Sequence, residues 1–380
     1  MTAIVTPNTD TFTNPTMVSL LRYLQSKGET VVMFGPQQYP QMPEEFADIR
    51  FEPTHFKLSF RNPKAWKKQI LSYCKVKRCL GDGSGCTLMA VDPLGLVTGG
   101  RIKRWLCPKV KLSYLSFEIF FKDELKGHYL KMKEKEISYS RYIDSLLTQD
   151  ETRRDLLFAE NGFCLDSSKV ALVPVSPDRI EVGGKADIHA LFNIPQEKKL
   201  VVYSGSVGRW CGTQCIVDAL TGGKWPDDWH LVFHSRRDPE EGSEFHDILY
   251  RLDAAPSMPF TLHPHPFGPM SELASFLSGF DAALALYFPN NENPYYGRNM
   301  QEIGFSSGKF SMYMMLGLPT VVTGCRTYRE QIAKYNFGAV ADTSDELCEV
   351  LRSGKFEKDG CEKLYNEILR PESKEYDKIA

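Results

Sequence analysis

Short apolar runs and amphipathic stretches alternate along most of the chain. An apolar run at residues 3–6 precedes a polar loop and then a stretch with apolar residues at helical spacing, namely Met17, Leu20, Leu21 and Leu24. Asn14 caps this predicted helix, and Pro15 takes its first position, where no N–H donor is needed. The next apolar run, at residues 30–34, completes a strand–loop–helix–strand unit. This order predicts a parallel sheet.

The alternation continues to about residue 160 and restarts near residue 199. Further strands are predicted at residues 88–91, 112–115, 143–148, 199–203, 230–234, 260–263, 281–286 and 320–323. Further helices are predicted at residues 129–140, 151–160, 270–278, 309–316, 328–334, 345–352 and 359–369. Residues 174–198 are rich in proline, glycine and charge, which is typical of a linker.

These elements predict an α/β fold with two doubly wound parallel-sheet (Rossmann-like) domains facing a cleft. We place an N-terminal domain at residues 1–185, a C-terminal domain at 186–370 and a tail at 371–380. Ligands of such sheets bind at the carboxyl ends of the strands, so candidate site residues are sought there.

Composition excludes several classes of protein. The chain has 380 residues and 42% hydrophobic content, which excludes a disordered, collagen-like or coiled-coil chain. No apolar run approaches the roughly 18 residues that span a bilayer, and the start of the chain lacks the features of a secretory signal. The ten cysteines form no CxxC pair. We therefore expect a cytoplasmic protein with reduced cysteines.

Charge is spread unevenly along the chain. Residues 56–136 contain 18 Lys+Arg and 7 Asp+Glu, whereas the whole chain has a net charge of −2. A basic segment attracts phosphates or an anionic membrane face. The alternative is a solvated surface of lysine-rich helices. No zinc-finger or RNP-type motif accompanies the charge, so nucleic acid is not an expected partner.

The strongest local motif lies at residues 302–310, directly before a predicted helix. Small side chains, helix N–H groups and one lysine gather there, which favours a phosphate site at Ser306, Ser307, Gly308 and Lys309. The alternative is an ordinary helix cap with Lys309 in solvent. The motif is not a Walker A loop, because Phe310 follows Lys309.

A second glycine-rich turn, at residues 204–210, follows one strand and precedes a helix. Arg209 in this turn is suited to the oxygens of a diphosphate, although a tight turn with a surface arginine explains the pattern equally. His234, His263 and His265 lie at strand ends, where a base and a ribose bind in such folds. Histidines at strand ends are also commonly structural.

In the first domain, polar residues follow three predicted strands. Asn14 follows the first strand, Asp92 follows another, and Glu118 follows a third. Carboxylates there orient sugar hydroxyls, or alternatively cap turns and helices. No H-E-x-x-H motif or DxD pair is present, so a built-in metal is not expected. The sequence also lacks the GxSxG elbow that would indicate a serine hydrolase.

The segment at residues 281–289, the run at 303–322 and its continuation at 328–338 together resemble the donor-binding half of GT-B-fold glycosyltransferases. The combination is most similar to the retaining family 4 (glycosyltransferase group 1). This resemblance covers residues 199–353 well, and the first domain only in its order of elements.

The resemblance implies a nucleotide-sugar donor and assigns roles to the residues above. Arg209 and Lys309 would neutralise the donor diphosphate, helped by N–H groups around Ser306, Ser307 and Gly308. The base would meet His234, His263, His265 and Phe267, with Asn299 nearby. The loop at 8–14 would form the acceptor side through Asn8 and Asn14, together with Asp92. The candidate catalytic residues are Glu118, Asp10 and Glu302.

One motif of the resembled family is missing. Relatives usually carry two glutamates eight positions apart around this helix, one for the sugar and one for the ribose. Aligning Lys309, Gly317 and Pro319 places Gly304 and Met312 at these positions. Glu302 or Asn299 is the expected substitute.

We therefore hypothesise a retaining, metal-independent glycosyltransferase of the hexosyltransferase type, without a cofactor, acting in glycan or polysaccharide synthesis. It would transfer a sugar from a nucleoside diphosphate to an acceptor hydroxyl. The basic first domain favours an anionic or lipid-linked acceptor and peripheral contact with an anionic membrane. The alternatives are a nucleotide-sugar epimerase, which needs acid/base residues, and a non-catalytic nucleotide-sugar binding protein, motivated by Met312.

Overall fold

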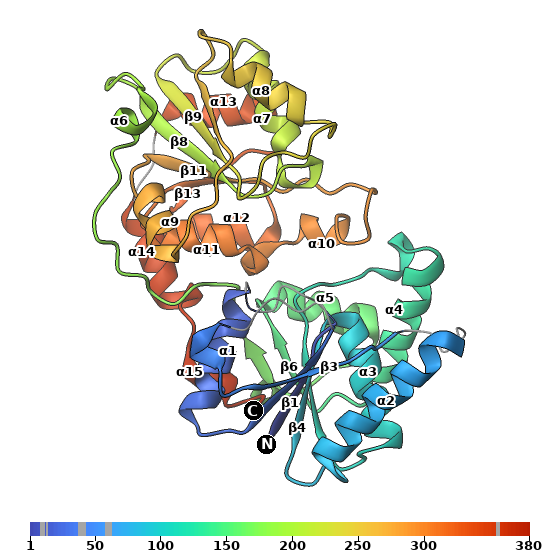
Figure 1. Ribbon diagram of the computed structural model, residues 1–380. Helices are drawn as coiled ribbons and strands as arrows, with labels where there is room; N and C mark the ends of the chain where they lie inside the picture. Colours follow the sequence, from blue (N-terminus) through green and yellow to red (C-terminus); the bar gives the residue numbers. More distant parts are fainter. Residues whose placement is uncertain (8–11, 13, 37–42, 58–62, 355–357) are drawn as a thin grey trace. The chain divides into compact units, whose positions relative to one another are not determined.

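The computed structural model describes residues 1–7, 12, 14–36, 43–57, 63–354 and 358–380. The chain forms two compact units (Figure 1). Met1–Val175 and Pro371–Ala380 make up the first unit, and Ser176–Arg370 the second. The first boundary lies ten residues before the one expected from the linker composition. The last ten residues, expected as a tail, belong to the first unit.

The first unit is built on a seven-stranded parallel sheet with the order β3-β2-β1-β4-β5-β6-β7. The strands are β1 (Thr2–Val5), β2 (Val31–Gly35), β3 (Arg50–Pro53), β4 (Thr87–Val91), β5 (Lys111–Leu115), β6 (Ser145–Thr148) and β7 (Val170–Leu172). Strand order reverses between β1 and β4, which is the point where doubly wound sheets bind ligands at their carboxyl edge.

Helices cover both faces of this sheet. They are α1 (Pro15–Ser26), α2 (Pro63–Leu80), α3 (Asp92–Trp105), α4 (Gly127–Ser140), α5 (Glu151–Asn161) and α15 (Ser373–Tyr376). Figure 1 shows α1 and α15 on one side, and α2 and α3 on the other. α3 packs closely against α4 at Gly100. A Cβ added there would lie only 2.5 Å from the ring of Tyr139, so the contact requires glycine.

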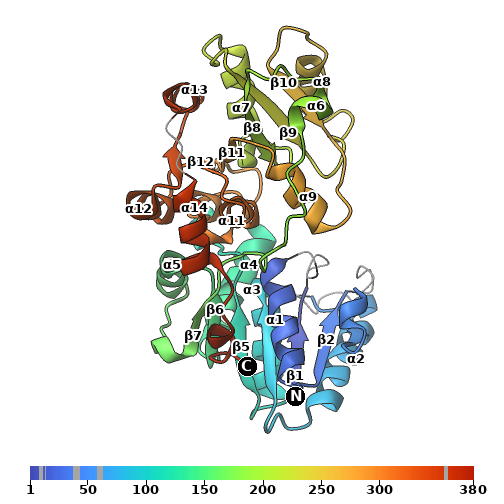
Figure 2. The same cartoon turned by 90° about the vertical axis from the view of Figure 1, so that its left-hand side faces the viewer.

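The predicted first helix is confirmed. The Asn14 side chain accepts hydrogen bonds from the N–H groups of Thr16 (3.0 Å) and Met17 (3.3 Å), and Pro15 opens the helix. Its apolar stripe is fully buried and packs in one core with β1, β2 and Tyr376 of α15. Figure 2 shows the C-terminal segment, in red, beside β7.

The second unit has a six-stranded parallel sheet with the order β10-β9-β8-β11-β12-β13. Its strands are β8 (Lys199–Ser204), β9 (Trp229–His234), β10 (Phe260–His263), β11 (Ala282–Ala285), β12 (Thr320–Val322) and β13 (Gly338–Val340). Strand order reverses between β8 and β11, so this sheet repeats the doubly wound pattern of the first.

Two hydrophobic cores enclose this second sheet. One contains α7 (Thr213–Thr221), α8 (His246–Asp253) and α13 (Ser344–Ser353). The other contains α9 (Met270–Leu277), α11 (Gly308–Met315), α12 (Arg326–Tyr335) and α14 (Asp359–Leu364). Shorter segments are α6 (Ile188–Phe192), α10 (Arg298–Gln301), η5 (Arg209–Cys211), η6 (Gly304–Ser306) and the π-helical η7 (Tyr365–Leu369).

All strands predicted from the apolar runs are present, whereas β3, β7, β13, α2, α3, α6, α8, α10 and α15 were not predicted. No helix in the described part of the chain is long and apolar enough to cross a bilayer.

Candidate functional site

The candidate donor site lies at the carboxyl edge of the second sheet, where strand order reverses. α11 begins at Gly308, directly after its N-cap Ser307, whose side chain accepts a hydrogen bond from the N–H of Phe310 (3.2 Å). This confirms the predicted helix start. An N-terminal helix end at a strand-order reversal favours anion binding, because several N–H groups and the helix dipole point the same way.

Lys309, in the first turn of α11, lies against tyrosine side chains. Its ammonium donates a hydrogen bond to the Tyr203 hydroxyl (3.0 Å) and lies 4.1 Å from the Tyr203 ring centroid. The Tyr287 ring centroid is 5.2 Å away. Because burial disfavours the charged form, the pKa of Lys309 is lowered to about 8. Lys309 is therefore a half-buried cation at the sheet edge and not a side chain in bulk water.

The two glycine-rich turns predicted as separate phosphate sites meet at Lys309. A Cβ placed on Gly205 would lie 2.7 Å from the Lys309 ammonium. The N–H of Ser204 donates to the Tyr313 hydroxyl of α11 (3.0 Å), which ties the end of β8 to this helix. A residue larger than glycine at position 205 would therefore displace Lys309.

Tyr203 and Tyr287 contact Lys309, and Tyr313 joins the end of β8 to the same helix; we call these three residues the tyrosine cage of Lys309. The cage was missed by the sequence interpretation, because its members come from β8, the end of β11 and α11. The Tyr287 hydroxyl is hydrogen-bonded to that of Ser307 (2.5 Å), so this cage also holds the helix cap. The only sequence signal was a tyrosine at two strand ends of the second unit.

Arg209, in η5, is engaged in ion pairs. Its guanidinium forms a two-point contact with the carboxylate of Glu244, with Nε 2.8 Å from Oε2, and lies 3.8 Å from Glu292. The hydrogen bond from Arg209 lowers the pKa of Glu244. About half of the Arg209 side chain is exposed (49%), so a phosphate has to compete with Glu244 for it.

The predicted serines have different environments. Ser307 is buried and its hydroxyl serves the helix cap and Tyr287. Ser306 is half-buried at the end of η6, and its N–H donates to the Ile303 carbonyl (2.9 Å). Main-chain groups of Gly308 and Lys309 at the start of α11 are therefore better placed as anion donors than the Ser307 side chain.

The histidines lie together at the ends of β9 and β10. Cα partners pair Ser204 with His234, and His234 with His263, so the three strand ends are level. The two ring nitrogens of His234 contact Ser204 Oγ (2.7 Å) and the His265 carbonyl (3.0 Å). Burial lowers the pKa of His234 to about 4, so the ring is neutral at pH 7. His234 is a structural link between these strand ends.

An aromatic cluster surrounds this link. The ring centroids of His234 and Phe267 are 5.0 Å apart, and those of His263 and Phe267 are 5.7 Å apart. His265 is exposed, while His263 and Phe267 are partly exposed. The accessible rings of this cluster are suited to stacking against a planar base.

Asn299 and Glu302 lie in the segment just before α11. Asn299, in α10, is buried and its amide donates to the Tyr295 carbonyl (3.1 Å). Glu302 directly follows α10 and is half-buried. Met312, a residue of α11, is buried in the hydrophobic core, and its side chain offers no polar group at the surface.

In the first unit, the structure brings Asp92 and Glu118 together. The Asp92 carboxylate accepts hydrogen bonds from the N–H groups of Phe117 (2.9 Å) and Glu118 (3.1 Å). Asp92 has a φ of +58° although Pro93 follows it, a backbone conformation that is strained for a residue other than glycine. Asn14 uses its side-chain oxygen as a helix cap. Asn8 and Asp10 lie outside the described residues.

Within the described part of the chain, no group of three or more His, Cys, Asp or Glu side chains is arranged to hold a metal ion.

Sequence comparison identifies no relative, because no protein-family model matches the chain and no curated protein matches it significantly. Comparison with solved structures finds proteins of similar fold over nearly the whole chain. Sucrose-phosphate synthase from Thermosynechococcus elongatus aligns with a TM-score of 0.68 at 12% identity, over 99% of this chain and 96% of that one.

Two further structures cover the chain to a similar extent. HepE from Anabaena, in complex with UDP-glucose, has a TM-score of 0.69 at 11% identity over 97% of this chain and 95% of that one. The lipopolysaccharide outer core galactosyltransferase WaaB, in its apo form, has a TM-score of 0.62 at 13% identity, over 99% of this chain and 97% of that one. The chain therefore has the two-domain α/β fold of GT-B glycosyltransferases.

Proposed function

We propose that the chain transfers a sugar from a nucleoside diphosphate to an acceptor hydroxyl. The observation that carries this proposal is Lys309, a cation held by the tyrosine cage at the start of α11 where the second sheet reverses its strand order. Among the similar structures, HepE is in complex with UDP-glucose and WaaB is a galactosyltransferase, which supports a nucleotide-sugar donor.

In the proposed reaction, the bond between the anomeric carbon and the β-phosphate oxygen breaks as the acceptor oxygen attacks the same face, and the proton of the acceptor hydroxyl passes to the departing phosphate oxygen. Lys309 and the N-terminal N–H groups of α11 stabilise the negative charge that develops on the departing diphosphate. Arg209 adds a second cation once a phosphate displaces Glu244. These fixed charges supply the stabilisation for which other enzymes use a metal ion, so we propose a metal-independent, retaining transfer without a cofactor.

We assign the base to the aromatic cluster of His263, His265 and Phe267, with His234 holding the strand ends. Asn299 and Glu302 are assigned to the sugar and ribose hydroxyls, because Met312 cannot accept or donate a hydrogen bond at the usual position. Asp92 and Glu118 are proposed for acceptor recognition at the carboxyl edge of the first sheet.

The buried Met312 also favours a second candidate, a non-catalytic nucleotide-sugar binding protein. The two are separated by incubating the protein with UDP-glucose and a panel of glycan and lipid-linked acceptors, followed by mass spectrometry. Transfer predicts a mass increase of one hexose on an acceptor. Binding that is saturable while no acceptor changes mass would contradict transferase activity. Conversion of the donor to an epimer without acceptor would favour an isomerase instead.

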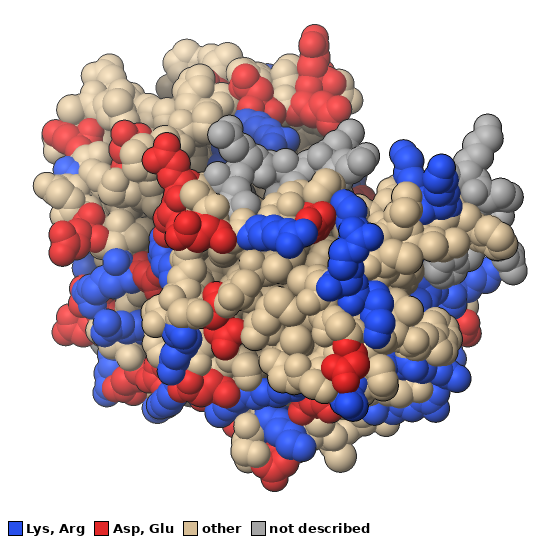
Figure 3. Space-filling model, turned by 60° about the horizontal axis from the view of Figure 1, so that its bottom comes forward, with Lys and Arg blue, Asp and Glu red and all other residues tan. Residues whose placement is uncertain are grey.

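We also propose contact with an anionic membrane through α2. Trp66 and Ile70 lie four residues apart on this helix and are each about half exposed, as is Leu71. Exposed basic residues flank this apolar strip, including Lys67, Lys68 and Lys77. Basic side chains also gather on the side of Figure 3 where Figure 1 draws α2. An apolar strip bordered by lysines is typical of helices that lie at a membrane interface.

Sedimentation with vesicles tests this contact. Vesicles containing anionic lipid should retain the protein at low salt and release it at high salt, because salt screens the attraction. The Trp66→Ser/Ile70→Ser variant should lose retention. The control Leu191→Ser, at an exposed apolar residue of the second unit, should keep it. Equal retention of both variants would refute the role of α2.

A further inference from the structure

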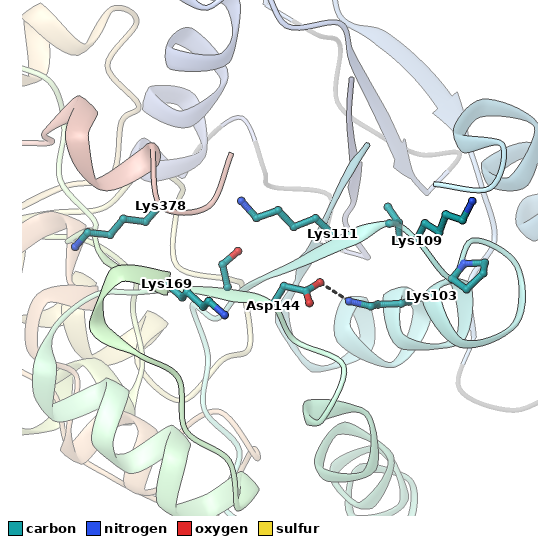
Figure 4. Close-up of a pocket in the computed structure, with 9 residues that line it drawn as sticks. Lys103, Lys109, Lys111, Asp144, Lys169 and Lys378 are labelled. Atoms are coloured by element: carbon teal, nitrogen blue, oxygen red, sulfur yellow. Dashed lines mark hydrogen bonds and ion pairs between the residues drawn. The ribbon is translucent and has the colours of Figure 1, made fainter. Parts of the chain in front are cut away.

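A pocket lined mostly by lysines lies in the first unit, away from the residues assigned above. Its volume is about 430 Å³. Five lysines and a single carboxylate line it: Lys103, Lys109, Lys111, Lys169, Lys378 and Asp144. Figure 4 shows these side chains arranged around the starts of β5 and β6.

The fold explains why lysines from distant parts of the sequence meet there. β5, β6 and β7 are adjacent and parallel, and they begin at Lys111, Ser145 and Val170. Lys169 directly precedes β7, and Lys103 lies in the last turn of α3. Lys378 comes from the C-terminal segment. The pocket is therefore at the amino edge of the sheet, opposite the carboxyl edge where doubly wound sheets bind substrates.

Three of the five lysines have acidic partners. Lys103 is paired with Asp144, Lys109 with Asp82 (2.9 Å) and Lys378 with Glu375 (2.8 Å). Asp144 is further occupied, since its carboxylate also accepts a hydrogen bond from the N–H of Leu112 (2.6 Å). The carboxylates around the pocket are thus already engaged.

The other two lysines form no ion pair with an acidic side chain of the described residues, although the charge of Lys169 contributes to the lowered pKa of nearby Asp166. The Lys111 ammonium donates to the main-chain oxygen of Ala380 (2.8 Å). The ammonium of Lys169 makes no hydrogen bond or ion pair with the described part of the chain, and its side chain is exposed. Ammonium groups that line one pocket create a positive potential that favours an anion there.

We propose that this pocket binds an anion bearing a phosphate group, with Lys111 and Lys169 as its main contacts. The pocket volume falls within the range of small-molecule sites, and lysine is a common ligand for phosphate. The anion would link the starts of β5 and β7 with the C-terminal segment. A soluble phosphate ester and a phospholipid headgroup present the same chemistry.

Calorimetric titration with pyrophosphate at low salt tests the proposal. Wild-type protein should show one site that depends on Lys111 and Lys169, and a second that depends on Lys309 in the other unit. In the Lys111→Gln/Lys169→Gln variant, the affinity of the first site for pyrophosphate should fall by about tenfold for each ammonium lost. Lys309→Met should remove only the second site. If the donor proposal fails, Lys309→Met changes nothing, while the lysine pocket is still detected.

Two further variants guard against misfolding and non-specific charge effects. Lys169→Gln alone changes an exposed residue, and it should weaken pyrophosphate binding by about tenfold. The control Lys126→Gln/Lys131→Gln removes the same charge from exposed positions of the same unit and should leave the affinity unchanged. If the pocket lysines only offset the negative helix end of α3, the double variant changes stability but not pyrophosphate binding, which overturns the proposal.

The source of the phosphate is distinguished by one matched pair of ligands. Glycerol 3-phosphate presents the group in solution, and phosphatidic acid presents it in phosphatidylcholine vesicles. Saturable binding of glycerol 3-phosphate that Lys111→Gln/Lys169→Gln abolishes supports a soluble ligand. Vesicle retention that this variant abolishes, without binding of glycerol 3-phosphate, supports a headgroup. If the variant alters neither, the pocket does not bind phosphate.

Discussion

At the scale of single residues, the proposed chemistry depends on the charge of Lys309. Its tyrosine cage offers ring faces and a hydroxyl oxygen but no carboxylate, so the cation is held without being neutralised. Such a group is available to a diphosphate at little cost. Arg209 differs, because it must first leave Glu244.

The lowered pKa of Lys309 predicts a pH dependence of ligand binding. In the ligand-free protein this pKa is about 8, and a neighbouring diphosphate should raise it. Affinity for UDP should therefore fall as the pH rises above about 8, where the diphosphate group of UDP is already fully ionised. Calorimetry between pH 7 and about 10 measures this. Lys309→Arg, which stays charged, should bind without that decline, and a wild-type affinity constant across the range would contradict the assignment.

The same lowered pKa predicts how the stability of the unliganded protein changes with pH. The pKa of Lys309 is lower in the folded state than its ordinary value of 10.5, so the unfolded chain binds more protons between pH 8 and 10.5. The free energy of unfolding contributed by this group therefore rises with pH across that window. Ligand affinity and intrinsic stability should change in opposite directions.

At the scale of elements, Asp92 fixes the loop after β5 that carries Glu118. Asp92→Ala removes the acceptor of two main-chain N–H groups and keeps a strained positive φ, so we expect a loss of about 2–4 kcal/mol in the free energy of unfolding. Asp92→Asn keeps an acceptor and tolerates this backbone conformation, so it should lose much less. Denaturant unfolding of both variants checks this, and equal losses would show that the carboxylate oxygen is not the cause.

The elements also show what could be predicted from the sequence. Apolar runs identified the central strands, because strands buried on both faces are almost continuously hydrophobic. β3 was missed because Arg50 and Glu52 interrupt it at the sheet edge. α3 was missed because Gly95, Gly99 and Gly100 weaken its helical pattern, while serving close packing. The pairing of Arg209 with Glu244 spans 35 residues, and no local pattern contains it.

At the scale of the whole molecule, the chain returns to the first unit after completing the second. Tyr376 and Ile379 are buried there, and the Tyr376 ring lies 5.3 Å from that of Tyr23. Composition indicated only a charged tail, since two apolar residues carry no periodic signal. The last ten residues are therefore a structural part of the first unit.

Tyr376→Ala should destabilise the first unit by about 3–5 kcal/mol, because a large buried ring is removed. Limited proteolysis should then cleave within Met1–Val175 first, while the second unit remains resistant. The exposed neighbour Lys374 supplies a control as Lys374→Ala, which should leave the cleavage rates unchanged. Equal acceleration of cleavage in both units would contradict this assignment.

The central claim is that the cage around Lys309 receives the diphosphate of a sugar donor. The most direct measurement is thermal stabilisation by UDP, since a ligand at 100 times its dissociation constant adds about 2.7 kcal/mol. We predict that wild-type protein and the control Lys363→Ala, an exposed lysine of α14, are stabilised, whereas Lys309→Met is not. Equal stabilisation of all three proteins, or of none across a panel of nucleoside diphosphates, would contradict the claim.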